Sequence, residues 1–186
     1  MDKQLIKLAE TTLLILNNKS WNSIKLDEIY KKSKVNKKNV RRKITNKLDL
    51  LSNINRYFDL QLTSTSEIVD QSSHKDMIFE VMMMRFDILQ NYRKSIIRVF
   101  DALKRKPQEL LLLIPSFIES MVVITRMAKI PISGLKGNLK IKGLLVIYFL
   151  SFLVWTKDNC DSLEKTMKSL DNYLNNAGSL LSILNK

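Results

Sequence analysis

The chain has 186 residues, a formal net charge of +13 and 45% hydrophobic residues, which is enough for a buried core. Its four glycines and three prolines are too few for a many-turned β-fold and favour long helices. A single cysteine, Cys160, excludes an intramolecular disulfide and a multi-cysteine metal site. No Cys–His or Ser–His–Asp set can be nominated, since the only histidine, His74, lies in the polar stretch SSHKD. Both are expected to be packing, capping or surface residues. We therefore expect no enzyme, no metal and no cofactor.

The first expected helix covers residues 2–16, because apolar side chains recur there at spacings of three and four and form one face. Residues 17–20 end it, and Trp21 is expected in the core. The start of the chain, MDKQLIKLAETTL, is charged and amphipathic and has no secretory-signal pattern, so we expect a cytoplasmic protein.

The next segment predicts a short helix, a tight turn and a second short helix. The first helix is expected at 26–33 and the second at 37–44, with Asn36 as its N-cap. Val40 and Ile44 are four residues apart, so they share one face and hold the second helix to the core. The basic residues of that helix are left facing outward.

A fourth helix is expected at 47–62, capped by Thr45-Asn46. A polar break at 63–73 follows. The sequence therefore predicts an N-terminal domain over 1–62 and a C-terminal helical domain over 63–186.

The positive charge is concentrated in the N-terminal domain. Residues 1–62 contain fourteen basic and six acidic residues, and eleven of the basic residues fall between Lys19 and Lys47. Such a cationic helical unit suits a polyanion, because each lysine or arginine that neutralises a phosphate releases counterions. The alternative interpretation is a solvated, lysine-rich face without a specific partner.

The C-terminal domain is expected to consist of helices. They are predicted at 77–103, at 109–127 with Pro115 as a kink or break, and, after a loop at 128–137, at 138–156 and 161–185. The most apolar run, 143–155, has about thirteen residues, against the roughly twenty that cross a bilayer. We therefore expect a buried helix and no integral membrane insertion.

The last helix carries a heptad-like apolar stripe. Its members alternate at steps of four and three: Leu163, Met167, Leu170, Leu174, Ala177, Leu181 and Leu184. One interpretation is a helix facing its own core, and the other is half of a dimer seam paired with the apolar helix before it. The second interpretation predicts a homodimer interface that contains Leu144, Ile147, Leu163, Met167, Leu170, Leu174 and Leu181.

Residues 5–51 resemble the DNA-binding domain of the TetR family of transcriptional repressors. The residues that match the family signature are Ile29, Val35, Lys47, Leu50 and Leu51. Asn36 replaces the family's capping serine, and Val40 and Ile44 replace its leucine and phenylalanine anchors. The sequence departs from the signature at Tyr30, Ser33, Lys34, Arg41 and Lys43, where the family usually has Ala, Ala, Gly, Tyr and His.

The C-terminal part is similar to proteobacterial members of that family. The similarity lies in Arg85-Phe86-Asp87 with Leu89-Gln90, and in Trp155, Asp158 and Thr166-Met167. These features are also similar to the lipid-binding family that assists ubiquinone biosynthesis, which shares the architecture and does not bind DNA. That family supplies the alternative function, supported by the eroded glycine and tyrosine of the signature.

The resemblance implies an all-α fold: an N-terminal three-helix helix-turn-helix DNA-binding domain and a C-terminal helical ligand-binding and dimerisation domain. It implies a homodimeric repressor of transcription that binds double-stranded DNA. The residues expected near base edges are Lys37, Lys38, Asn39 and Arg42, and those expected at phosphates are Lys25, Arg41, Lys43 and Lys47.

The resemblance also implies an effector pocket in the C-terminal domain, for a small apolar effector or lipid. The residues expected to line it are Met82, Phe86, Phe100, Phe117, Met121 and Met127. Plain core filling is the alternative interpretation of the same side chains.

Overall fold

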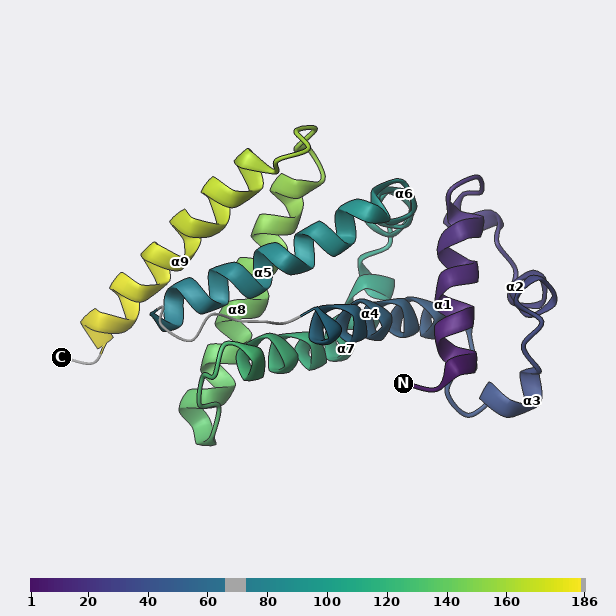
Figure 1. Ribbon diagram of the computed structural model, residues 1–186, viewed down its shortest axis with the longest axis horizontal. Helices are drawn as coiled ribbons and strands as arrows, with labels where there is room; N and C mark the ends of the chain where they lie inside the picture. The colour runs from purple at the N-terminus through teal and green to yellow at the C-terminus, as the bar shows by residue number, and fades with distance from the viewer. Residues whose placement is uncertain (66–72, 185–186) are drawn as a thin grey trace. The chain divides into compact units, whose positions relative to one another are not determined.

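The computed structural model describes residues 1–65 and 73–184, with side chains described up to residue 177. All regular elements in these ranges are helices (Figure 1). They are α1 (Lys3–Leu16), the short 3-10 helix η1 (Trp21–Ser23), α2 (Leu26–Ser33), α3 (Lys37–Val40), α4 (Lys47–Ser64), α5 (His74–Asn91), α6 (Arg93–Leu103), α7 (Pro107–Met127), α8 (Gly134–Trp155) and α9 (Glu164–Leu184).

The chain divides into two compact units. The first contains residues 1–64 and 87–120, and the second contains residues 65–86 and 121–186. The first unit therefore joins α1 to α4 with the end of α5, with α6 and with the first part of α7. The second unit contains the first part of α5, the end of α7, and α8 and α9.

In the first unit, α1 packs against α2, α4 and α6. Its apolar face is buried as predicted, with Leu8, Ala9 and Leu16 fully buried. Asn53 on α4 donates to the Leu5 carbonyl at 2.8 Å, and the Ser95 hydroxyl on α6 donates to the Leu13 carbonyl at 2.7 Å. These buried hydrogen bonds fix α4 and α6 on α1 in addition to the apolar contacts.

In the second unit, α8 packs against α9. Leu170 and Leu174 of α9, Leu163 just before it, and Leu144 and Ile147 of α8 are buried. Asp158, in the connection between the two helices, is fully buried and accepts from Thr166 N and Oγ1, both at 2.8 Å. Burial opposes ionisation of Asp158, but these hydrogen bonds together hold its pKa below the usual value.

The single helix predicted at 77–103 is wrong. The structure has two helices, α5 and α6, that meet at Tyr92, whose φ of −117° and ψ of 18° are not helical. The Tyr92 hydroxyl lies 3.3 Å from that of Tyr57 and accepts from Gln61 Nε2 at 3.2 Å. These contacts with α4 favour the break, and no glycine or proline in the sequence marks it.

Two other predictions for the C-terminal part differ from the structure. The alternatives for Pro115 were a kink or a break, and the break is wrong because Pro115 lies inside α7. The carbonyl that loses its partner belongs to Leu111, and both residues are exposed, so water can reach the unpaired group. The loop predicted at 128–137 ends at Ser133, because α8 begins at Gly134.

Within the described residues, α7 and α8 are each long and apolar enough to cross a membrane by length and composition. The 22 residues of α8 exceed the run of about thirteen read from the sequence, because the helix begins before the apolar run. Core helices of soluble proteins meet the same criterion, so these two helices are weak grounds for a membrane span.

Candidate nucleic-acid interface

The segment from α2 to α3 forms a helix-turn-helix within the first unit (Figure 1). Lys34 ends α2 in the left-handed conformation, with φ 55° and ψ 26°. The family that the segment resembles usually has glycine here, and a lysine at this φ costs about 1 kcal/mol. The turn therefore forms with lysine at its left-handed position.

Neighbouring side chains support this turn. The Ser33 hydroxyl, which is fully buried, donates to the Tyr30 carbonyl at 3.2 Å and accepts from Val35 N at 3.4 Å. The Tyr30 hydroxyl donates to the Ile44 carbonyl at 3.4 Å, and burial raises the pKa of Tyr30. Tyr30 and Ser33, two departures from the family signature, thus make hydrogen bonds that alanine cannot make.

The second helix of the motif is shorter than predicted. Asn36 caps it as expected, its side chain accepting from Lys38 N at 2.9 Å. The regular helix α3 ends at Val40, and turns continue to Lys43, with Ile44 N still bonded to the Val40 carbonyl at 2.9 Å. Lys37 and Lys38 in the first turn of α3 oppose the helix dipole, which disfavours a longer helix.

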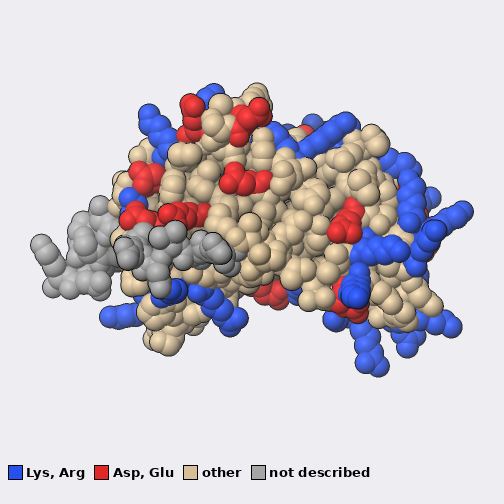
Figure 2. Space-filling view, viewed as in Figure 1, with Lys and Arg blue, Asp and Glu red and all other residues tan. Residues whose placement is uncertain are grey.

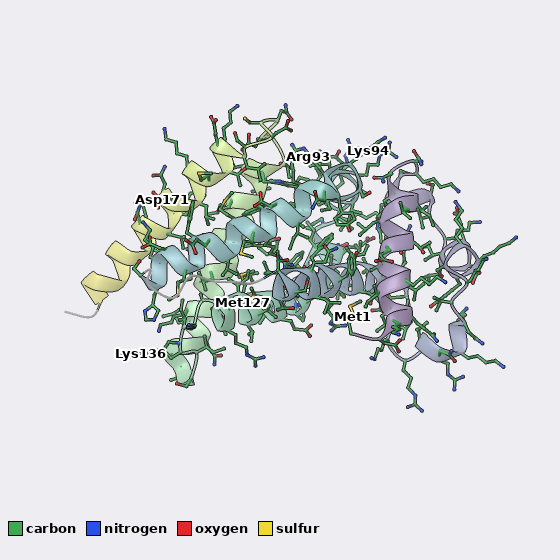
Figure 3. The ribbon with its side chains drawn as sticks, in the orientation of Figure 1. Met1, Arg93, Lys94, Met127, Lys136 and Asp171 are labelled. Atoms are coloured by element: carbon green, nitrogen blue, oxygen red, sulfur yellow. The ribbon has the colours of Figure 1, made fainter. Side chains whose placement is uncertain are left out.

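The apolar anchors are buried as predicted, and the polar side chains point away from them. Val40 is 2% exposed and Ile44 is 4% exposed. The residues classed as exposed around them are Lys37, Lys38, Asn39, Arg41, Arg42 and Lys43, together with Lys25 at the start of α2. Figure 2 shows lysine and arginine side chains gathered over α2 and α3, and Figure 3 shows them extending outward.

Two acidic residues on α2 reduce the local charge only partly. Glu28 pairs with Lys19 at 2.7 Å and with Lys32 at 3.6 Å, and Asp27 lies 3.8 Å from Lys37. The hydrogen bond from Lys19 is the main cause of the lowered pKa of Glu28. Among the described residues, the structure records no ion pair for Lys38, Arg41, Arg42 or Lys43, so α3 and the turns that follow it present an uncompensated cationic surface.

Lys47 is placed differently from the other predicted DNA-binding residues. Its ammonium donates to the Trp21 carbonyl and lies 4.4 Å from the centroid of the Trp21 ring. Partial burial, and then the charge of Lys106, lower the pKa of Lys47 below its usual value. Trp21 is only 2% exposed, and it holds the side chain of Lys47, which the sequence analysis expected to contact a phosphate.

The residues predicted to line an effector pocket fall in both units. Met82, Phe86 and Met121 are fully buried in the second unit, and Met127 is half-buried there. Phe100 and Phe117 are half-buried in the first unit. The Phe86 ring stacks on Tyr148 at 5.5 Å, and the fully buried Arg85 donates from Nε to the Tyr148 hydroxyl at 3.3 Å.

The residues predicted for a dimer interface are mostly buried inside the second unit. Leu144, Ile147, Leu163, Leu170 and Leu174 are buried, whereas Met167 is 42% exposed. Leu181 lies outside the residues whose side chains the structure describes. The outward face of α8 carries a different apolar row that the sequence analysis missed, made of Leu139, Val146, Leu150 and Leu153. Its spacing of seven, four and three was visible in the sequence, but the neighbouring apolar residues obscured it.

No protein-family model and no curated protein matches the sequence. Solved structures do match the fold. The TetR transcriptional regulator from Nitrosomonas europaea ATCC 19718 matches with a TM-score of 0.71 and 16% identity, over 95% of this chain and 99% of that chain. A TetR transcriptional regulator from Rhodococcus sp. RHA1 matches with a TM-score of 0.58 and 13% identity, over 92% of this chain and 94% of that chain.

The protein is thus an all-α protein whose N-terminal part contains a helix-turn-helix. Its chain has the fold of the TetR transcriptional regulators over nearly its whole length. The TetR-like fold predicted from the sequence is confirmed.

Proposed function

We propose that this protein is a cytoplasmic, homodimeric DNA-binding regulator of transcription of the TetR type, with no enzymatic activity. The observation that carries the proposal is the cationic face of α3 and of the turns up to residue 43, which is fixed by the buried Val40 and Ile44 and exposed to solvent. A short helix presented in this way can enter the major groove of a duplex. Residues 1–62 serve as the DNA-binding domain, and residues 63–186 as the regulatory and dimerisation domain.

Two kinds of contact are proposed for this surface. Lys37, Lys38, Asn39 and Arg42 approach base edges, where arginine pairs bidentately with guanine and asparagine with adenine. Lys25, Arg41 and Lys43 approach phosphates. Lys37 also lies 5.9 Å from the Tyr30 ring centroid, which restricts its side chain without burying it.

The homodimer is supported by apolar side chains that the chain itself does not cover. Leu139 and Val146 on α8 are 61% and 58% exposed, and Leu150, Leu153 and Met167 are also exposed. A second copy that covered this row would remove a continuous apolar stripe from water. Such a dimer would present two recognition helices to half-sites about one helical turn or more apart.

The proposed regulator is a repressor released by a small apolar effector. Met82, Phe86, Met121 and Met127, all of the second unit, are the proposed lining. Methionine side chains adapt to irregular apolar ligands. Met82, Phe86 and Met121, which are fully buried, supply an apolar lining of this kind. Apolar material from a cell extract, added to a preformed protein–duplex complex, should lower the affinity for the duplex.

The central test is the salt dependence of duplex binding. Fragments of the protein's own genome are first selected by binding, and a selected duplex of about 30 base pairs is then titrated at several salt concentrations. We expect affinity to fall steeply and linearly on a log–log plot as salt rises, because phosphate contacts release counterions. The bound species should contain two chains per duplex.

Arg42→Ala should weaken binding of the selected duplex by roughly 5- to 150-fold, because a base-reading arginine contributes about 1–3 kcal/mol. Arg126→Ala is the matched control, since Arg126 is an exposed arginine on the part of α7 that belongs to the second unit. Absence of binding at low salt would end the proposal. Binding to anionic liposomes but not to duplex would favour the lipid-binding alternative instead.

A further inference from the structure

The turn between α6 and α7 is a second basic feature of the first unit. It contains Lys104, Arg105 and Lys106, all exposed. The surrounding residues 93–112 contain six basic and two acidic residues. The proposed contacts of the helix-turn-helix leave this charge unexplained.

Hydrogen bonds between α4 and α7 locate the turn within the unit. Asn55 donates to Ser116 Oγ at 2.9 Å, and one helical turn further along both helices Ser120 donates to Asp59 at 2.8 Å. Because both partners advance by four residues, the two helices run in the same direction. The start of α7 therefore lies beside the start of α4, directly after the helix-turn-helix.

The electrostatics of Lys47 agree with this placement. Lys47 is the first residue of α4, and after burial the charge of Lys106 is the next cause of its lowered pKa. Lys106 is therefore near Lys47, as the pairing of the helices requires. The basic turn and the segment that follows the recognition helix lie on the same side of the unit.

The three cations of the turn are not equivalent. Lys104 pairs with Asp101 at 2.6 Å, and Lys106 pairs with Glu109 at 2.9 Å. Across the described ranges the structure records no ion pair for Arg105. Its planar guanidinium, which matches phosphate oxygens bidentately, is therefore the cation of the turn best suited to an anionic partner.

We propose that the α6–α7 turn is an additional phosphate-binding element, and that Arg105 contacts the duplex backbone beside the base pairs that α3 faces. This inference rests on the proposed DNA-binding function and extends it. Contacts of this kind position a protein on the duplex without reading its sequence. Arg105 would therefore raise affinity for every duplex equally, whereas Arg42 would change the preference among sequences.

Arg105→Gln tests the proposal, with Arg105→Lys and Arg126→Gln as companions. The selected duplex and the same duplex with altered half-sites are titrated with each variant at several salt concentrations. For Arg105→Gln we expect the slope of log affinity against log salt to fall by about 0.9, the value for one phosphate contact. The ratio of affinities for the two duplexes should stay unchanged. Arg105→Lys should retain the slope, and Arg126→Gln should behave as the unaltered protein.

Three results would overturn the proposal and are distinguishable from one another. If the unaltered protein shows no salt-dependent duplex binding, the proposed function fails and the role of Arg105 fails with it. If it does bind but Arg105→Gln matches Arg126→Gln, only the role of Arg105 fails. If Arg105→Gln weakens binding to vesicles of anionic phospholipid but not to duplex, the turn serves a membrane surface. Urea unfolding of Arg105→Gln should match the unaltered protein, because the side chain is exposed.

Discussion

Helices α3 and α4 begin with the same two residues, asparagine and then lysine, and use the second residue in opposite ways. Both asparagines are N-caps: Asn36 accepts from Lys38 N at 2.9 Å, and Asn46 accepts from Leu48 N at 2.8 Å. Lys37, the next residue in α3, has a side chain that is 66% exposed. Lys47, the next residue in α4, is held on the carbonyl and ring of Trp21.

The N-termini of α3 and α4 also differ at the third residue of each helix. In α4 this position is Asp49, whose carboxylate accepts from Thr45 N at 2.7 Å and from Asn46 N at 2.9 Å. Asn and Asp thus satisfy each other's backbone donors, as in a capping box. In α3 the same position is Asn39, which is exposed. The doubly capped helix runs for 18 residues and the singly capped one for 4.

The difference shows that the cap decides where a helix begins, whereas neighbouring packing decides what its first residues do. A buried tryptophan beside α4 turns its lysine into a structural group. The region beside α3 offers Lys37 only a distant Tyr30 ring and an exposed Asp27, so the side chain stays available to a partner.

The largest effect on stability is expected from replacement of Trp21, which tests whether packing makes Lys47 a structural group. Trp21→Ala deletes a side chain that is 2% exposed and leaves a cavity where Lys47 was supported. We expect the free energy of unfolding, measured with urea, to fall by about 3–5 kcal/mol. Trp21→Phe should cost less, because it keeps an aromatic face. In a double-mutant cycle, Lys47→Met should matter less in the Trp21→Ala protein than alone. Independent effects of the two substitutions would mean that Lys47 is not a structural group.

A smaller effect is expected at the second cap of α4. Partial burial opposes ionisation of Asp49, but the hydrogen bonds from Thr45 and Asn46 lower its pKa below the ordinary value of 3.8. A carboxyl whose pKa is lower in the folded state stabilises the protein at pH values above its unfolded-state pKa. This contribution is lost as the pH falls through the folded-state pKa. Asp49→Asn should therefore cost about 1 kcal/mol at neutral pH and progressively less in acid.

Urea unfolding at neutral pH and at about pH 3 measures this effect, with Asp161→Asn, at an exposed aspartate after α8, as the control. A cost of Asp49→Asn that is equal at both pH values would contradict the assigned hydrogen bonds.

The features that the sequence predicts correctly are local ones. Asn36 and Asn46 act as caps through backbone groups within three residues, and Val40 and Ile44 are buried because their spacing places them on one face. The break at Tyr92 depends on hydroxyl contacts with Tyr57 and Gln61, more than thirty residues earlier. A local pattern contains no sign of such a contact.

The candidate site shows the same limit. Periodicity identifies Leu163, Leu170 and Leu174 as one apolar face, but it does not say whether the chain's own α8 or another molecule covers them. In this chain they are buried within the second unit. The contact of Lys47 with Trp21 was missed for a related reason, since the Trp21 carbonyl is 26 residues away.

The smallest expected effect concerns the turn that leads into α3. Lys34 and Lys129 are both lysines in the left-handed region, with φ of 55° and 53°, the first in the helix-turn-helix and the second in the other unit. Glycine adopts this φ without the steric cost of a Cβ atom, although it gives the unfolded chain more freedom. Lys34→Gly should therefore be about 0.5–1 kcal/mol more stable than Lys34→Ala, which removes the same charge but keeps the Cβ.

At Lys129 the glycine variant should be more stable than the alanine variant by the same amount. Only the substitutions at Lys34 should alter duplex binding, because only that turn sets the angle at which α3 leaves α2. If Lys34→Gly is no more stable than Lys34→Ala, the left-handed conformation at this position is wrong, and the presentation of α3 derived from it would have to be revised.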